Sequence, residues 1–180
     1  MLRRAMLLGW CALAIACTGA GIDRSDAVPV RATLSIRPVA DGEAWPERMA
    51  RVAGQTAGLE VEATTIQSRR LPPVPAYRIR APTKAALQAL VRSTGQIPVK
   101  LQVGYERESE GRWWALVVRT DQGLVLGDDT RVKLSHEPDG ESLFLLLGSD
   151  DASAFERLTI EHDGRRLAIM DGNEVLLAPT

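Results

Sequence analysis

The apolar residues between positions 30 and 107 follow alternating periods, and this pattern restricts the fold more than any other feature of the sequence. Residues 32–37 alternate between apolar and polar side chains, which predicts a half-buried strand, and Pro38 ends it. A helix is expected next, with Gly58 as its C-terminal cap. Its apolar face consists of Trp45, Met49, Val52 and Ala53.

Two further strands and a second helix complete this first region. Segments 59–67 and 77–80 alternate with period two, and the proline-rich loop 71–75 joins them. Thr83 is suited to cap a helix, and a last strand is expected at 99–105. The order strand, helix, strand, strand, helix, strand predicts a ferredoxin-like base over residues 30–107.

The pattern changes after the charged segment 106–112, which we interpret as a boundary. Short strands are expected at 113–120, 124–126, 131–136 and 143–147. A short helix opening at Ser149 follows, and then a hairpin that turns through Asp171 and Gly172. The expected fold class is therefore α+β, with a small head of short strands, one helix and a C-terminal hairpin at 113–180.

Residues 1–16 read as an export signal. Arg3 and Arg4 precede an uncharged apolar run of 12 residues, whereas a helix that crosses a bilayer needs about 20. Both cysteines, Cys11 and Cys17, lie in or directly after this leader, so the folded part has no pair for an internal disulfide. The location expected for the remaining chain is the periplasm.

The segment Ala14-Ile15-Ala16-Cys17 resembles the lipobox of bacterial lipoproteins. The resemblance implies lipidation of Cys17 with fatty acid such as palmitate, and Thr18 after the cysteine implies an outer-membrane anchor. Residues 17–29 would then be a tether. The alternative is an ordinary signal peptide cut after Ala16 or Ala20.

Composition and motifs give no sign of catalysis. The chain has 22 basic and 23 acidic residues, a balance that argues against nucleic acid. His136 and His162 are 26 positions apart with no metal-ligand spacing, and we expect both to be exposed polar residues. The pairs Asp128-Asp129 and Asp150-Asp151 fit turn and helix-start roles. We expect no enzyme activity, no metal and no cofactor.

The segment 155–179 resembles the head subdomain of the first periplasmic domain of SecD, the accessory subunit of the protein-export translocon. The matching residues are Phe155, Leu158, Thr159, Gly164, Arg165, Asp171, Gly172 and Pro179. Segment 75–103 resembles the SecD base more weakly. SecD proteins carry several transmembrane helices. This sequence contains no apolar segment of the roughly 20 residues that such a helix needs.

The resemblance implies a non-enzymatic protein that binds unfolded or extended polypeptide in connection with protein export or envelope protein handling. Extended chains commonly bind by adding a strand to an exposed sheet edge. The alternative is a structural or assembly lipoprotein that docks one folded envelope partner. In either case the lipid anchor would attach the protein to the membrane.

Overall fold

The computed structural model describes residues 12–16, 26–30, 33–67, 72–108, 110–137 and 140–178. These residues form two compact units. Unit 1 contains residues 1–32 and 126–155, and unit 2 contains residues 33–125 and 156–180. The described chain is a mixed α/β structure dominated by sheet, with three helices.

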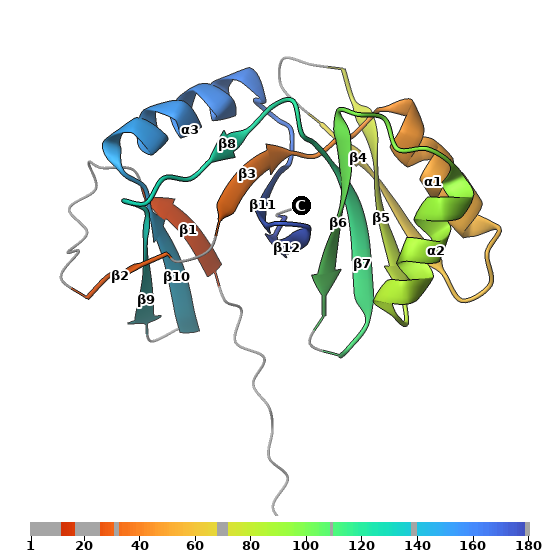
Figure 1. Cartoon of the computed structure of the whole chain (residues 1–180), viewed down its shortest axis with the longest axis horizontal. Helices are drawn as coiled ribbons and strands as arrows, with labels where there is room; N and C mark the ends of the chain where they lie inside the picture. Colours follow the sequence, from red (N-terminus) through yellow and green to blue (C-terminus); the bar gives the residue numbers. More distant parts are fainter. Residues whose placement is uncertain are drawn as a thin grey trace, which may run out of the picture. The chain divides into compact units, whose positions relative to one another are not determined.

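Unit 2 is built on an eight-stranded sheet with the order β4-β5-β7-β6-β12-β11-β3-β8 (Figure 1). Its strands are β3 (Leu34–Pro38), β4 (Glu60–Ile66), β5 (Val74–Ala81), β6 (Leu101–Arg107), β7 (Trp113–Arg119), β8 (Leu124–Val125), β11 (Leu167–Asp171) and β12 (Glu174–Leu177). Most neighbours are antiparallel, but β12 pairs with β6 in parallel.

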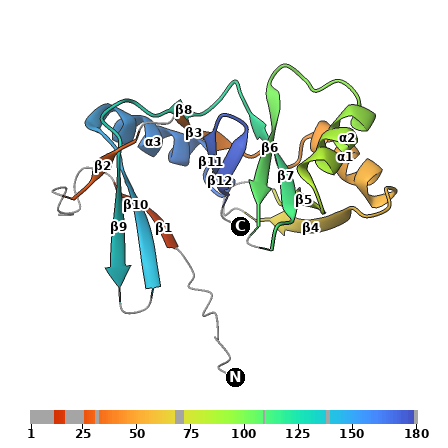
Figure 2. The same ribbon diagram turned by 60° about the horizontal axis from the view of Figure 1, so that its bottom comes forward.

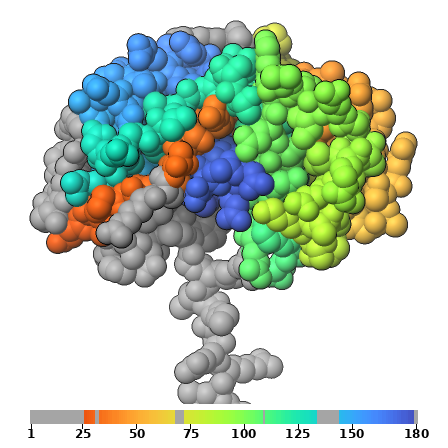
Figure 3. All heavy atoms as spheres, viewed as in Figure 1, coloured from red at the N-terminus to blue at the C-terminus, as the bar shows by residue number. Residues whose placement is uncertain are grey.

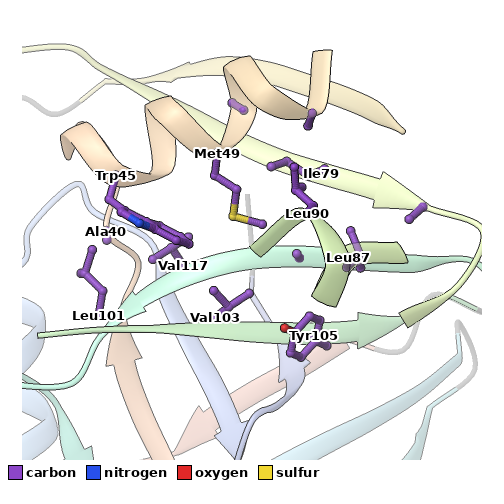
Figure 4. Close-up of a cluster of buried hydrophobic side chains, with 14 residues drawn as sticks. Ala40, Trp45, Met49, Ile79, Leu87, Leu90, Leu101, Val103, Tyr105 and Val117 are labelled. Atoms are coloured by element: carbon purple, nitrogen blue, oxygen red, sulfur yellow. The ribbon is translucent and has the colours of Figure 1, made fainter. Parts of the chain in front are cut away.

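Two helices, α1 (Ala44–Gly54) and α2 (Lys84–Thr94), cover one face of strands β4 to β7. Trp45 and Met49 of α1 point at the sheet together with Leu87 of α2 (Figure 4). The indole Nε1 of Trp45 donates to the carbonyl of Gln96 at 3.1 Å, which satisfies its only polar atom. Both helices are thus held by burial of one apolar face.

A second core is formed by side chains from β7, β11, β12 and the residue after β3. An isolated bridge between Val39 and Val118 returns the end of β3 to β7, and the hairpin of β11 and β12 lies between β3 and β6 (Figure 3). The buried side chains of this core are Val39, Leu116, Val118, Ala168, Met170 and Val175. A Cβ built on Gly104 would lie 2.6 Å from Val175 Cγ2, so any larger residue there would force the Val175 side chain to shift.

Unit 1 is a four-stranded sheet with the order β1-β10-β9-β2. Its strands are β1 (Ala12–Ala16), β2 (Val28–Pro29), β9 (Arg131–Glu137) and β10 (Gly140–Leu146), and helix α3 (Ser149–Glu161) follows β10. The hairpin of β9 and β10 has β1 alongside β10 (Figure 2). Buried Asp151 in the first turn of α3 accepts hydrogen bonds from Gly127 N at 2.7 Å and Thr130 Oγ1 at 3.0 Å.

Most of the expected local elements are present. Thr83 caps α2, because its Oγ1 accepts from Ala86 N at 3.2 Å. The C-terminal hairpin turns between Asp171 and Glu174. The expected cap at Gly58 is wrong, since α1 ends four residues earlier at Gly54.

The compact units differ from the division expected at 106–112. That segment joins two paired strands, and Arg107 lies opposite Trp113 across the β6–β7 ladder. The reason is that β7 is buried on both faces, with Val117 in the core under the helices and Val118 in the second core. Strand β7 also pairs with β5 along one edge and with β6 along the other, so it joins strands of the expected base into one sheet.

The expected lipid anchor and the expected absence of a transmembrane helix both concern the membrane. Cys17 and most of the tether lie outside the described residues, and the last five residues of the expected leader form β1. No helix in the described segments has the length and apolarity needed to cross a membrane.

Candidate functional site

An open groove of about 540 Å³ lies in unit 2 between the end of β4 and the segment that leads into β11. This volume is in the range of ligand-binding clefts. The groove is lined by Thr64, Thr65, Ile66, Gln67, Gly164, Arg165, Arg166 and Leu167. One wall is therefore the end of a strand, and the other is the segment 164–167.

The first wall presents backbone groups that the sheet does not use. Among the described strands, β4 pairs with β5 alone. Thr65 lies opposite Pro75, which has no N–H, and the Pro75 carbonyl accepts from Gly42 N at 2.9 Å. The Thr65–Pro75 pair is therefore a non-hydrogen-bonded pair of the antiparallel ladder, and the N–H and C=O of Thr65 point to the open side of β4.

The second wall is held in place by a buried ion pair. Arg166 donates from Nε to Asp41 Oδ2 at 2.9 Å and from Nη2 to Asp41 Oδ1 at 2.6 Å. The two side chains are 5% and 2% exposed. The carbonyl of Arg166 also accepts from Val39 N at 2.9 Å. These contacts fix the backbone at Arg166, directly after Arg165, whose half-buried side chain lines the groove.

Of the eight residues named above for the resemblance, the structure brings Gly164 and Arg165 to the groove. Gly164 has φ +73° and ends the turn after α3, where Arg165 N donates to the His162 carbonyl. Leu158 is buried, and Thr159 Oγ1 donates to the carbonyl of Glu156, so both serve the helix.

The other motif residues lie away from the groove or outside the description. Asp171 and Gly172, with φ +58°, form the hairpin turn between β11 and β12. Phe155 is half-buried in α3 and belongs to unit 1. Pro179 and the lipidation candidate Cys17 lie outside the described residues.

The histidines and acidic pairs do not assemble into a reactive site within the described residues. No group of three or more His, Cys, Asp or Glu there could hold a metal ion. His162 is half-buried rather than exposed, and burial lowers its pKa. His136 lies in β9. Asp151 is occupied by its bonds to Gly127 and Thr130.

A row of paired charges crosses the sheet on the face opposite the helices. Arg78 and Arg80 lie over the ring of Trp114 at 4.0 and 4.1 Å from its centroid. Arg78 pairs with Glu106 at 2.7 Å, Arg80 pairs with Glu60 at 3.3 Å, and Trp114 Nε1 donates to Glu108. The alternation of β5 places its arginines on this face, but their partners come from three other segments.

The groove itself could not be located from the sequence. Its β4 wall depends on the pairing of Thr65 with Pro75, and the sequence assigned Pro75 to a loop. The cation–π cluster depends likewise on register, because Arg80 lies directly opposite Trp114. No family model matches the sequence, no curated protein matches it, and no solved structure matches the fold.

Proposed function

We propose that this chain is a non-enzymatic periplasmic lipoprotein that binds extended polypeptide through the open edge of β4, in connection with protein export or envelope protein handling. The observation that carries the proposal is the outward-facing backbone of Thr65 beside a groove of about 540 Å³. The finer fold assignment, a ferredoxin-like base with a SecD-like head, belongs to the same proposal. The order of elements along the chain from β3 to β6 agrees with a ferredoxin-like base. The sheet departs from it, because β7 rather than β3 lies between β5 and β6, and β3 lies next to β11.

The geometry suits strand addition. An extended peptide placed along β4 would pair its main chain with the free groups of the edge, and the groove would receive its alternate side chains. Because main-chain hydrogen bonds do not depend on side-chain identity, such a site accepts many sequences with modest affinity. Arg165 adds a positive charge on the opposite wall, which favours segments with an acidic or polar residue at that point.

The test uses the edge N–H of Thr65. Proline at this position removes that N–H without removing a ladder hydrogen bond to β5, so the sheet should tolerate it. Thr65→Ala is the matched control, because it shortens the side chain and keeps the N–H. Binding of a reduced, carboxymethylated model protein would be measured by fluorescence anisotropy with the processed chain carrying Cys17→Ser.

We expect Thr65→Pro to weaken binding by about tenfold, which corresponds to about 1.4 kcal/mol and is the scale of one hydrogen bond. Thr65→Ala should bind within about twofold of the wild type. Equal binding by all three proteins at unchanged melting temperature would exclude the β4 edge. Recovery of one stoichiometric folded envelope protein after crosslinking in cells, with no binding of denatured protein, would support the assembly role instead.

A further inference from the structure

The outer strand of unit 1 comes from the expected leader. Strand β1 runs parallel to β10, and its five residues pair in continuous register from Ala12 opposite Ser142 to Ala16 opposite Leu146. We propose that in the processed chain, which begins at Cys17, the β10 edge left by β1 binds an uncharged, apolar, extended segment of another polypeptide, parallel to β10. The inference rests on the proposed function and adds a second polypeptide site to it.

The hydrogen bonds of the neighbouring strands show which backbone groups of β9 point to β10. Val30 N donates to the Thr130 carbonyl at 3.1 Å, so Thr130 turns its groups toward β2. Antiparallel ladders alternate, and Arg131 and Lys133 therefore turn their groups toward β10. The pairing of Pro29 with Arg131 agrees with this, since proline has no N–H to donate.

The same alternation continues across β10. Leu146 and Phe144 lie opposite Arg131 and Lys133, so their N–H and C=O groups serve the ladder with β9. The intervening residues, Leu143 and Leu145, present their N–H and C=O to the edge where β1 lies. Removal of β1 therefore leaves four strong hydrogen-bonding groups without their strand partner.

The occupant of this edge is defined by the segment seated on it. The sequence of β1 is Ala-Leu-Ala-Ile-Ala, which is uncharged and extended over five residues. The edge is next to the apolar core of unit 1, because Leu145, Leu146 and Leu147 at the end of β10 are buried. A segment that replaces β1 must therefore be apolar, because a charge placed beside this core would lose hydration without a partner.

The parallel register also determines which backbone N–H groups of the bound segment form hydrogen bonds with β10. In a parallel pair, each bonded residue contacts the two residues that flank its opposite number. Leu143 and Leu145 lie opposite Leu13 and Ile15. The N–H groups of Ala14 and Ala16 therefore point to β10, whereas those of Leu13 and Ile15 point away from it.

N-methylated peptides test this register directly. The probe is a fluorescein-labelled peptide of residues 8–16 in which Cys11 is replaced by Ser, and its binding to the processed chain with Cys17→Ser is measured by anisotropy. One analogue is N-methylated at positions 14 and 16, and its matched control is N-methylated at positions 13 and 15. A variant Leu143→Pro removes an edge N–H of β10, and Leu143→Ala keeps it.

We expect the unmodified peptide to bind, the analogue methylated at 14 and 16 to bind at least about tenfold more weakly, and the control to bind within about threefold. Full-length chain, in which β1 covers the edge, should bind the peptide more weakly than the processed chain. Binding of the denatured model protein to the same samples is also measured, so that the β4 site is tested independently of the β10 site.

Any one of four results would overturn the inference. Equal binding of the two methylated peptides would show that the register is wrong, even if Leu143→Pro does not fold. Binding of the denatured protein without binding of the peptide would remove the β10 site and leave the β4 proposal standing, whereas loss of both would remove the two together. Self-association of the processed chain that Leu143→Pro abolishes would assign the edge to a second copy.

Discussion

The buried pair of Asp41 and Arg166 gives the sharpest prediction about stability. It joins residues 125 positions apart and fixes one wall of the groove. Asp41→Asn removes the negative charge but keeps a side chain that suits the turn before α1. The Arg166 guanidinium, 5% exposed, would then remain charged and buried without its counter-charge.

The cost follows from that burial. Removal of one partner from a buried ion pair typically costs about 3–5 kcal/mol, and the amide oxygen of Asn still accepts one hydrogen bond, which points to about 3 kcal/mol. For a chain of this size each kcal/mol corresponds to about 2–4 °C in melting temperature. We therefore expect Asp41→Asn to lower the melting temperature by about 6–12 °C.

Thermal and urea unfolding monitored by circular dichroism would measure this change. The double variant Asp41→Asn with Arg166→Met removes the buried, unpaired guanidinium charge. It should recover more than half of the lost melting temperature. Arg165→Ala, at the half-buried neighbour, should change the free energy of unfolding by about 0.5 kcal/mol or less. A loss below about 1 kcal/mol for Asp41→Asn, or a double variant no more stable than the single one, would refute the reasoning.

Other variants test separate parts of the structure. Cys17→Ser should release the protein into the soluble periplasmic fraction, and a wild type that is soluble and free of fatty acid by mass spectrometry would contradict the lipobox assignment. Gly104→Ala should cost about 1–3 kcal/mol in urea unfolding, because its Cβ would lie 2.6 Å from Val175 Cγ2; an unchanged midpoint would mean that the second core can yield. Burial lowers the pKa of His162, so the unfolded chain binds the proton more readily and the folded state loses stability as pH falls through the ordinary value of 6.5. His162→Gln should therefore become more stable relative to the wild type as pH falls below 6.5, whereas a stability difference independent of pH would contradict this linkage.

Local signals predicted the elements well because each depends on a few neighbouring residues. Period-two alternation located β4, although the strand extends only over Glu60–Ile66. The hydroxyl of Thr83 and the glycine of the Asp171-Gly172 turn act within three or four positions of the chain. The mixture of helices with short strands followed from the same patterns.

Register and pairing were decided only in three dimensions. The sequence predicted a short strand at 113–120, but it did not indicate that β7 would pair with β5 and β6 or that Val117 and Val118 would lie in two different cores. Strand β3 returns to β7 through the bridge of Val39 with Val118, which is 79 positions along the chain. No local preference specifies such a contact, because its free energy comes from packing between segments distant in sequence.

The candidate site shows the same separation. The sequence named Gly164 and Arg165 among the residues that carry the resemblance, and the role of Gly164 in ending the turn after α3 could be predicted from residue type alone. That they face the free backbone of Thr65 depends on Pro75 lying opposite Thr65 and on Asp41 holding Arg166. Hydrogen-bond direction alternates at every residue of a strand, so a shift of one position would turn the same groups inward, and only the tertiary register determines which way they point.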